Sequence, residues 1–113
     1  MASKNYEIGR RFEYRVQNWF RKHGYYVSRS YASKGLVDLL VIPPFVKVGW
    51  HNIALGIQAK KNGYVPPEER KTLEECKNKW QMMILIAWSD KKRKLRFRTV
   101  DGVEIPLDSL IYK

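Results

Sequence analysis

Hydrophobic residues recur every three or four positions near the start of the chain, which is the spacing of one face of an α-helix. They are Ile8, Phe12, Val16, Trp19 and Phe20. This stripe predicts a helix over 5–23, and Gly24 follows where a left-handed residue commonly closes a helix. A second helix is predicted over 66–79, because two prolines followed by two acids are typical of a helix start. Its Cys76 is interpreted as a small core residue.

Five further segments have the length and the apolar or β-branched composition of strands. They span 25–29, 36–42, 53–60, 82–88 and 95–100. Pro43 and Pro44 end the second segment, because consecutive prolines cannot continue a ladder of backbone hydrogen bonds. The order of helices and strands favours an α/β fold, with a mixed central sheet of about five strands flanked by helices in a single domain over 1–113.

Side chains alternate between the two faces of a strand, so Gln58 and Lys60 are predicted to share one face of the segment 53–60. Ala54 and Gly56 precede them on that face. Because both residues are small, they are expected to leave room above the sheet.

Asp38 interrupts the strand predicted over 36–42, which is otherwise apolar on both sides, as expected of an interior strand. Burying a lone carboxylate costs several kcal/mol unless it is paired, hydrogen-bonded or bound to a metal. A metal site at which Asp38 meets Gln58 and Lys60 would satisfy this acid. The alternative is an acid at the start of the strand that reaches solvent.

The charge of the chain adds a partner to this picture. Lys and Arg number 22 against 11 Asp and Glu, a formal net charge of +11 on 113 residues. Such a field attracts polyanions, of which nucleic acid is the leading one; a membrane surface, a ribosome or no specific partner are alternatives. A single cysteine excludes an intramolecular disulfide and favours a reducing, cytoplasmic location. No apolar run approaches the roughly 20 residues of a membrane span.

Two features stay open on the residues alone. Glu13 lies among arginines on the first helix, where it is either a solvated acid paired with Arg10 or Gln17 or part of a site. The alternation over 95–100 gives one apolar and one positive face, which is either a second basic patch or a solvated edge that discourages aggregation.

The acids and the lysine form a pattern that resembles the PD-(D/E)XK nuclease superfamily: Glu13 in the first helix, Asp38 after a polar loop, and Gln58-Ala59-Lys60 at the end of the next strand. More narrowly, a set of spaced residues is similar to archaeal-type Holliday junction resolvases. The set is Gly9, Glu13, Gly24, Arg29, Ser33 and Asp38. The resemblance covers roughly the first two thirds of the chain and implies a nuclease-like domain with the restriction-endonuclease-like fold.

The resemblance also implies a Mg²⁺ site, for which Mn²⁺ can substitute. Asp38, Gln58 and the backbone carbonyl of Ala59 would bind the ion, and Glu13 would hold it through a water molecule. Lys60 would orient or deprotonate the attacking water, or neutralise developing charge. The implied catalytic residues are therefore Glu13, Asp38, Gln58 and Lys60. The implied DNA-binding residues are Arg10, Arg11, Arg29, Ser33, Lys34, Lys61 and Tyr64.

The sequence departs from the family pattern at two positions. Val37 stands where many members have proline, and Gln58 stands where most carry glutamate or aspartate. An amide oxygen can coordinate Mg²⁺ but brings no negative charge, so weaker metal affinity is expected. A Gln-x-Lys version also resembles restriction endonucleases of the methylation-dependent type IV group.

Three functions follow from the resemblance and its departures. The first is a metal-dependent, structure-selective DNA endonuclease that resolves four-way (Holliday) junctions by phosphodiester hydrolysis. The second is a restriction-type or repair DNA endonuclease of the same fold, and the third is a non-catalytic nucleic-acid-binding domain. A junction has two equivalent cutting points, so a homodimer is implied. The segment 82–88 and the C-terminal tail are candidates either for its interface or for the core.

Overall fold

The computed structural model describes residues 4–29, 37–44, 53–80 and 82–111. Ser33, Lys34 and the segment 45–52 lie outside the described residues. The elements follow in the order α1 (Lys4–Lys22), β1 (Tyr26–Arg29), β2 (Leu39–Ile42), β3 (Leu55–Ala59), α2 (Pro67–Lys79), β4 (Met83–Ser89), β5 (Leu95–Thr99), β6 (Glu104–Ile105) and a short 3₁₀ helix, η1 (Leu107–Leu110).

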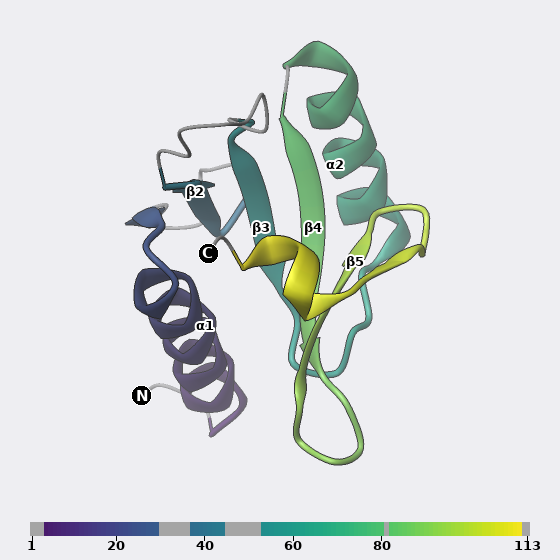
Figure 1. Ribbon diagram of the computed structural model, residues 1–113. Helices are drawn as coiled ribbons and strands as arrows, with labels where there is room; N and C mark the ends of the chain where they lie inside the picture. The colour runs from purple at the N-terminus through teal and green to yellow at the C-terminus, as the bar shows by residue number, and fades with distance from the viewer. Residues whose placement is uncertain (1–3, 30–36, 45–52, 81, 112–113) are drawn as a thin grey trace.

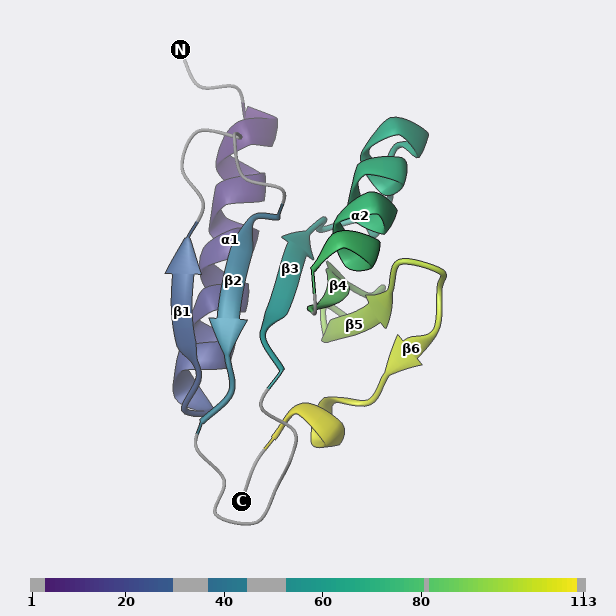
Figure 2. The same ribbon diagram turned by 90° about the horizontal axis from the view of Figure 1, so that it is seen from above.

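In the described part of the chain, six strands form one sheet in the order β1-β2-β3-β4-β5-β6. β3 and β4 are parallel and every other neighbouring pair is antiparallel. Figures 1 and 2 show α1 on one side of the sheet and α2 on the other. The predicted α/β fold with a mixed sheet flanked by helices is therefore confirmed, and the two-residue β6 is an addition to it.

The main core lies between α1 and the sheet. Phe12, Val16 and Phe20 of the predicted helical stripe are buried there. The Phe20 ring packs edge-on against Tyr25, with centroids 4.8 Å apart, and against Phe97 of β5, with centroids 5.4 Å apart. These aromatic contacts connect the first helix to the residue before β1 and to β5.

A smaller core lies beneath α2. Leu73 and Cys76 of this helix pack against Ile84 and Ile86 of β4, and all four are buried. The interpretation of Cys76 as a core residue is confirmed. Of the strand predicted over 82–88, residues 84–87 are buried inside the chain, so they fill the core and offer no free surface for a partner.

The second strand differs from its prediction. β2 begins at Leu39, and only one of its faces is buried, because Leu40 and Ile42 on the other face are 39% and 45% exposed. The cause is that α2 packs against β4 and leaves this side of β1 and β2 uncovered.

The space expected above Gly56 is filled. A Cβ atom on Gly56 would lie 2.9 Å from Cδ1 of Ile84 and 3.0 Å from Cγ1 of Val37. Close packing therefore accounts for the glycine, because a larger residue would require the side chains of Ile84 and Val37 to shift. Among the described helices, none combines the length and the apolar character needed to cross a membrane.

The C-terminal segment is held by one buried hydrogen bond, which the hydroxyl of Tyr25 donates to the backbone carbonyl of Leu110 over 2.6 Å. We expect Tyr25→Phe to lower the free energy of unfolding by about 1–2 kcal/mol, because the buried carbonyl loses its donor while the ring packing stays. Urea unfolding followed by tryptophan fluorescence measures this. The Tyr64 side chain is 64% exposed, so Tyr64→Phe is the matched control. Equal stability of the two variants would contradict the prediction.

Candidate active site

Asp38 lies just before β2, beside the end of the neighbouring strand β3. Its Oδ2 accepts a hydrogen bond of 2.8 Å from the backbone N–H of Ala59. Burial raises the pKa of Asp38 above its usual range, and the Ala59 N–H opposes this rise. The negative charges of Glu13 and Glu69 raise the Asp38 pKa further, whereas Lys60 lowers it. Asp38, the acid in the apolar segment, is therefore a partly buried carboxylate whose pKa responds to three nearby charged side chains.

Gln58 is almost completely buried, at 9% exposure. Its Oε1 accepts the backbone N–H of Asp38 over 3.1 Å, and its Nε2 donates to Oε1 of Glu69. The orientation of the amide is fixed by chemistry, because a backbone N–H can only donate and an ionised carboxylate can only accept. Gln58 thus joins the segment before β2, the strand β3 and the helix α2.

Lys60 follows β3, and its Nζ lies 2.9 Å from Oε2 of Glu69. Asp38, Gln58 and Lys60 were predicted to meet on one face of the sheet, and the contacts of Asp38 with Ala59 and Gln58 bring these segments together. The structure adds Glu69 to them.

The sequence contained a signal for Glu69. This residue precedes Leu73 by four positions and Cys76 by seven, so it lies on the buried face of α2. The Pro-Pro-acid-acid pattern predicts only a first-turn acid that favours helix initiation. The helical period, counted back from Leu73, places Glu69 on the buried face of α2 and the exposed Glu68 off it.

Glu13 and Arg29 form an ion pair of 2.8 Å, and the Glu13 side chain is 18% exposed. Glu13 does not pair with Arg10 or Gln17, the partners considered for a solvated acid. Arg29 reaches it because Arg29 lies on the side of β1 that faces α1, where its guanidinium also stacks 5.6 Å from the centre of the Tyr14 ring. Arg10, by contrast, contacts the hydroxyl of Tyr14.

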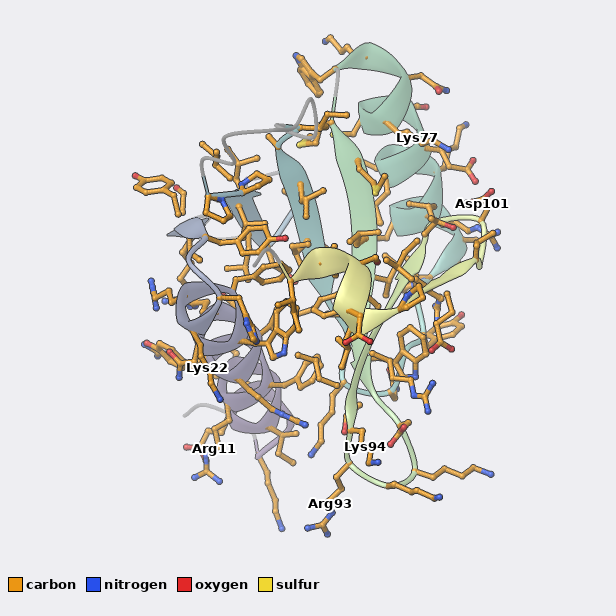
Figure 3. The ribbon with its side chains drawn as sticks, viewed as in Figure 1. Arg11, Lys22, Lys77, Arg93, Lys94 and Asp101 are labelled. Atoms are coloured by element: carbon orange, nitrogen blue, oxygen red, sulfur yellow. The ribbon has the colours of Figure 1, made fainter. Side chains whose placement is uncertain are left out.

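A cleft of about 690 Å³ opens next to Lys60, between the start of α1 and the turn that joins β4 to β5. Its lining residues are Ile8, Gly9, Ala59, Lys60, Lys61, Asn62, Ser89, Asp90 and Arg93. In Figure 3, Arg11, Arg93 and Lys94 lie at this same end of the molecule. Of the other predicted DNA-binding residues, Tyr64 and Arg10 are exposed. The cleft is therefore bordered by basic side chains on two sides.

The turn between β4 and β5 is held in shape by Asp90. Its carboxylate accepts the backbone N–H groups of Lys92 and Lys94 over 2.8 and 2.9 Å, and the side chain of Arg96 over 2.8 Å. The Lys94 N–H and the Arg96 side chain hold the pKa of Asp90 below its usual range. Arg15 of α1 donates to the backbone carbonyl of Arg93 over 2.6 Å, which fixes this basic turn beside the cleft.

Comparisons with known proteins support the fold. No family model matches the sequence, and no curated protein matches it either. A solved structure does: Hjc, a Holliday junction resolvase from the archaeal hyperthermophile Archaeoglobus fulgidus, with a TM-score of 0.66 over 93% of this chain and 98% of that chain. The chain has the fold of a Holliday junction resolvase. At 17% sequence identity, this likeness concerns the resolvase fold alone.

The residues of this resolvase fold suit the Mg²⁺ ion that the resemblance implies. No three or more His, Cys, Asp or Glu side chains gather into a metal-binding group in the described ranges. Mg²⁺ does not need such a group, because it is usually held by one or two carboxylates together with water and substrate phosphates. Asp38, Glu69 and Gln58 provide hard oxygen donors, and the second lone pair of the Gln58 amide oxygen is not used by Asp38. The donor set fits the ion.

We expect Asp90→Asn to lower thermal stability and Asp38→Asn not to lower it. The folded-state pKa of Asp38 is raised, so its charge destabilises the folded chain at neutral pH, and its removal should leave the melting temperature in EDTA equal or higher. The folded-state pKa of Asp90 is lowered, so its charge stabilises the folded chain at neutral pH. Asp90→Asn should lower the melting temperature, with the difference vanishing as the pH falls below the Asp90 pKa. A clear loss of stability in Asp38→Asn would contradict this.

Proposed function

We propose that this protein is a metal-dependent DNA endonuclease that resolves four-way junctions by phosphodiester hydrolysis. The observation that carries the proposal is the half-buried Asp38 carboxylate, held on the end of β3 next to Lys60 in a chain with the resolvase fold. Burying an acid in an otherwise apolar segment costs free energy of folding. A role in binding the metal for phosphodiester hydrolysis would explain why the acid is there.

Asp38, Gln58 and the Ala59 carbonyl would hold the Mg²⁺ ion, with Glu13 acting through a water molecule. The bound ion would supply Lewis acidity at the phosphate and lower the pKa of water. Lys60 would place its ammonium group next to the reacting phosphate, where it orients the attacking water or neutralises developing charge. Its contact with Glu69 holds the flexible lysine side chain in one position beforehand.

DNA would be held through its backbone by basic and polar residues. The residues proposed for these contacts are Arg10, Arg11, Arg29, Ser33, Lys34, Lys61 and Tyr64. A net charge of +11 and a basic border to the cleft support binding to phosphates. Contacts of this kind read the shape of DNA and not its bases, which suits a branched substrate.

We also propose that two copies of the chain form a two-fold dimer, which matches the two equivalent cutting points of a junction. The surface proposed for the interface is the uncovered side of β1 and β2. Tyr26 and Ile42 are paired in register there, and Leu40 lies on the same side. All three are apolar or aromatic and between 39% and 66% exposed, whereas 84–87 of β4 are buried within the chain.

On a synthetic four-way junction with Mg²⁺, we expect paired symmetrical cuts and little cutting of a linear duplex of the same sequence. Asp38→Asn should reduce the cleavage rate by at least about a hundredfold, because the carboxylate for the metal is lost, while junction binding in a gel-shift assay stays. Asp101→Asn, an exposed acid on the side of α2, is the matched control.

Each alternative function has its own outcome in this assay. Equal cleavage of the linear duplex would favour a restriction-type or repair endonuclease. Binding without cleavage over a range of Mg²⁺ and Mn²⁺ concentrations would favour a non-catalytic DNA-binding domain.

Leu40→Glu should weaken dimer formation by at least about tenfold, because it places a charge in a desolvated contact. Light scattering on a size-exclusion column measures this, with the wild type expected at twice the chain mass of 13.4 kDa. Val103→Glu alters a residue that is 59% exposed on the turn before β6 and serves as the control. A wild type that stays monomeric at every concentration would contradict the proposed interface.

A further inference from the structure

Gln58 stands where the family resemblance leads us to expect an acid, so β3 supplies one metal-binding carboxylate fewer than expected. Within the described residues, Glu13 is paired with Arg29, Glu69 is paired with Lys60, and Asp38 has no ion pair. Three carboxylates therefore face two cationic side chains. A bound cation would balance this excess of negative charge, provided that a second carboxylate besides Asp38 can reach the cation.

We propose that Glu69 of α2 is the second metal-binding carboxylate, an inference that rests on the proposed function, and that Gln58 is the residue that positions it. The carboxylate would reach the site from the first turn of a helix and not from the strand.

The contacts of Glu69 place it among the residues of the site. One carboxylate oxygen accepts from Nε2 of Gln58, and the other lies 2.9 Å from Nζ of Lys60. These two donors flank Ala59, whose N–H holds Asp38. Two hydrogen bonds through Gln58 thus connect the Glu69 carboxylate to the Asp38 backbone.

The carboxylate of Glu69 also has capacity left for a ligand. An ionised carboxylate offers about four acceptor positions, and two are used by Gln58 and Lys60. Its side chain is 27% exposed, so water and a phosphate can reach it. A pair of carboxylates completed by water and substrate oxygens is the usual environment of Mg²⁺ in proteins.

The simpler role for Glu69 is that of a counterion for Lys60. A measurement of metal affinity distinguishes this role from that of a metal ligand. Titration of the full chain with Mn²⁺, followed by the loss of the free-ion signal in electron paramagnetic resonance, reports the affinity without any cleavage. Glu69→Gln should weaken Mn²⁺ binding by at least about tenfold, because the ion loses one of its two carboxylate ligands. Glu68→Gln is the matched control, because Glu68 has the same charge in the same helical turn and is exposed.

An exchange variant makes the test independent of lost hydrogen bonds. Gln58→Glu combined with Glu69→Gln swaps the amide and the carboxylate and preserves their number, so Mn²⁺ affinity should return to within a few-fold of the wild type. The rise in melting temperature caused by Mn²⁺ should follow the same order, being small in Glu69→Gln and restored in the exchange variant. Because this rise is measured within each variant, an altered stability without metal does not obscure it.

Mn²⁺ affinity at the wild-type level in Glu69→Gln would overturn the inference, as would a wild type that binds no Mn²⁺. Failure of the proposed function looks different. Mn²⁺ binding that depends on Glu69, in a chain that cleaves no DNA, would remove the endonuclease but keep the metal ligand. Junction cleavage by the wild type, with unchanged Mn²⁺ affinity in Glu69→Gln, would keep the endonuclease and remove the ligand.

Discussion

The buried amide of Gln58 holds together the three segments that meet at the site. It belongs to β3, accepts the N–H of Asp38 ahead of β2, and donates to Glu69 at the start of α2. A polar group at 9% exposure must have its hydrogen bonds satisfied, and so must the groups that it contacts. The amide does both here, because its oxygen accepts from one neighbour and its nitrogen donates to the other. Gln58 therefore links the segments that carry Asp38 and Glu69, while the Ala59 N–H also holds Asp38 and Glu69 contacts Lys60 directly.

The topology of the sheet explains why a helix reaches the site at all. β3 and β4 are parallel, so the chain must cross over between them, and α2 is that crossover. Only 60–66 separate the end of β3 from the start of α2, so the first turn of the helix begins close to the strand end where Asp38 is held. The Pro66-Pro67 pair fixes where this turn begins. Meanwhile α1 covers the opposite side and brings Glu13 to Arg29.

Local patterns were sufficient to predict most of the fold and part of the site. The stripe from Ile8 to Phe20 predicted α1, and the period of a strand predicted a common face for Gln58 and Lys60, which both contact Glu69. What the patterns could not predict was which surface each element would cover. The face of β2 that carries Leu40 is exposed because α2 covers only part of the sheet, and the space over Gly56 is filled by a side chain from another strand. Glu69 was missed for a related reason, since its importance comes from the segment that it faces and not from its own neighbours in sequence.

The distribution of charge explains how a strongly basic chain can contain a metal site built from acids. The 22 basic side chains would attract the phosphates of the proposed DNA substrate, while Asp38 and Glu69 lie where β3 ends. Acids at that point repel DNA unless a divalent cation lies between carboxylate and phosphate, so metal and substrate would bind most tightly together. A metal ion requires negative charge close to it, and either a strand or a helix can supply the carboxylate. An amide on the strand is therefore compatible with metal chemistry when a neighbouring helix supplies the carboxylate, as proposed for Glu69.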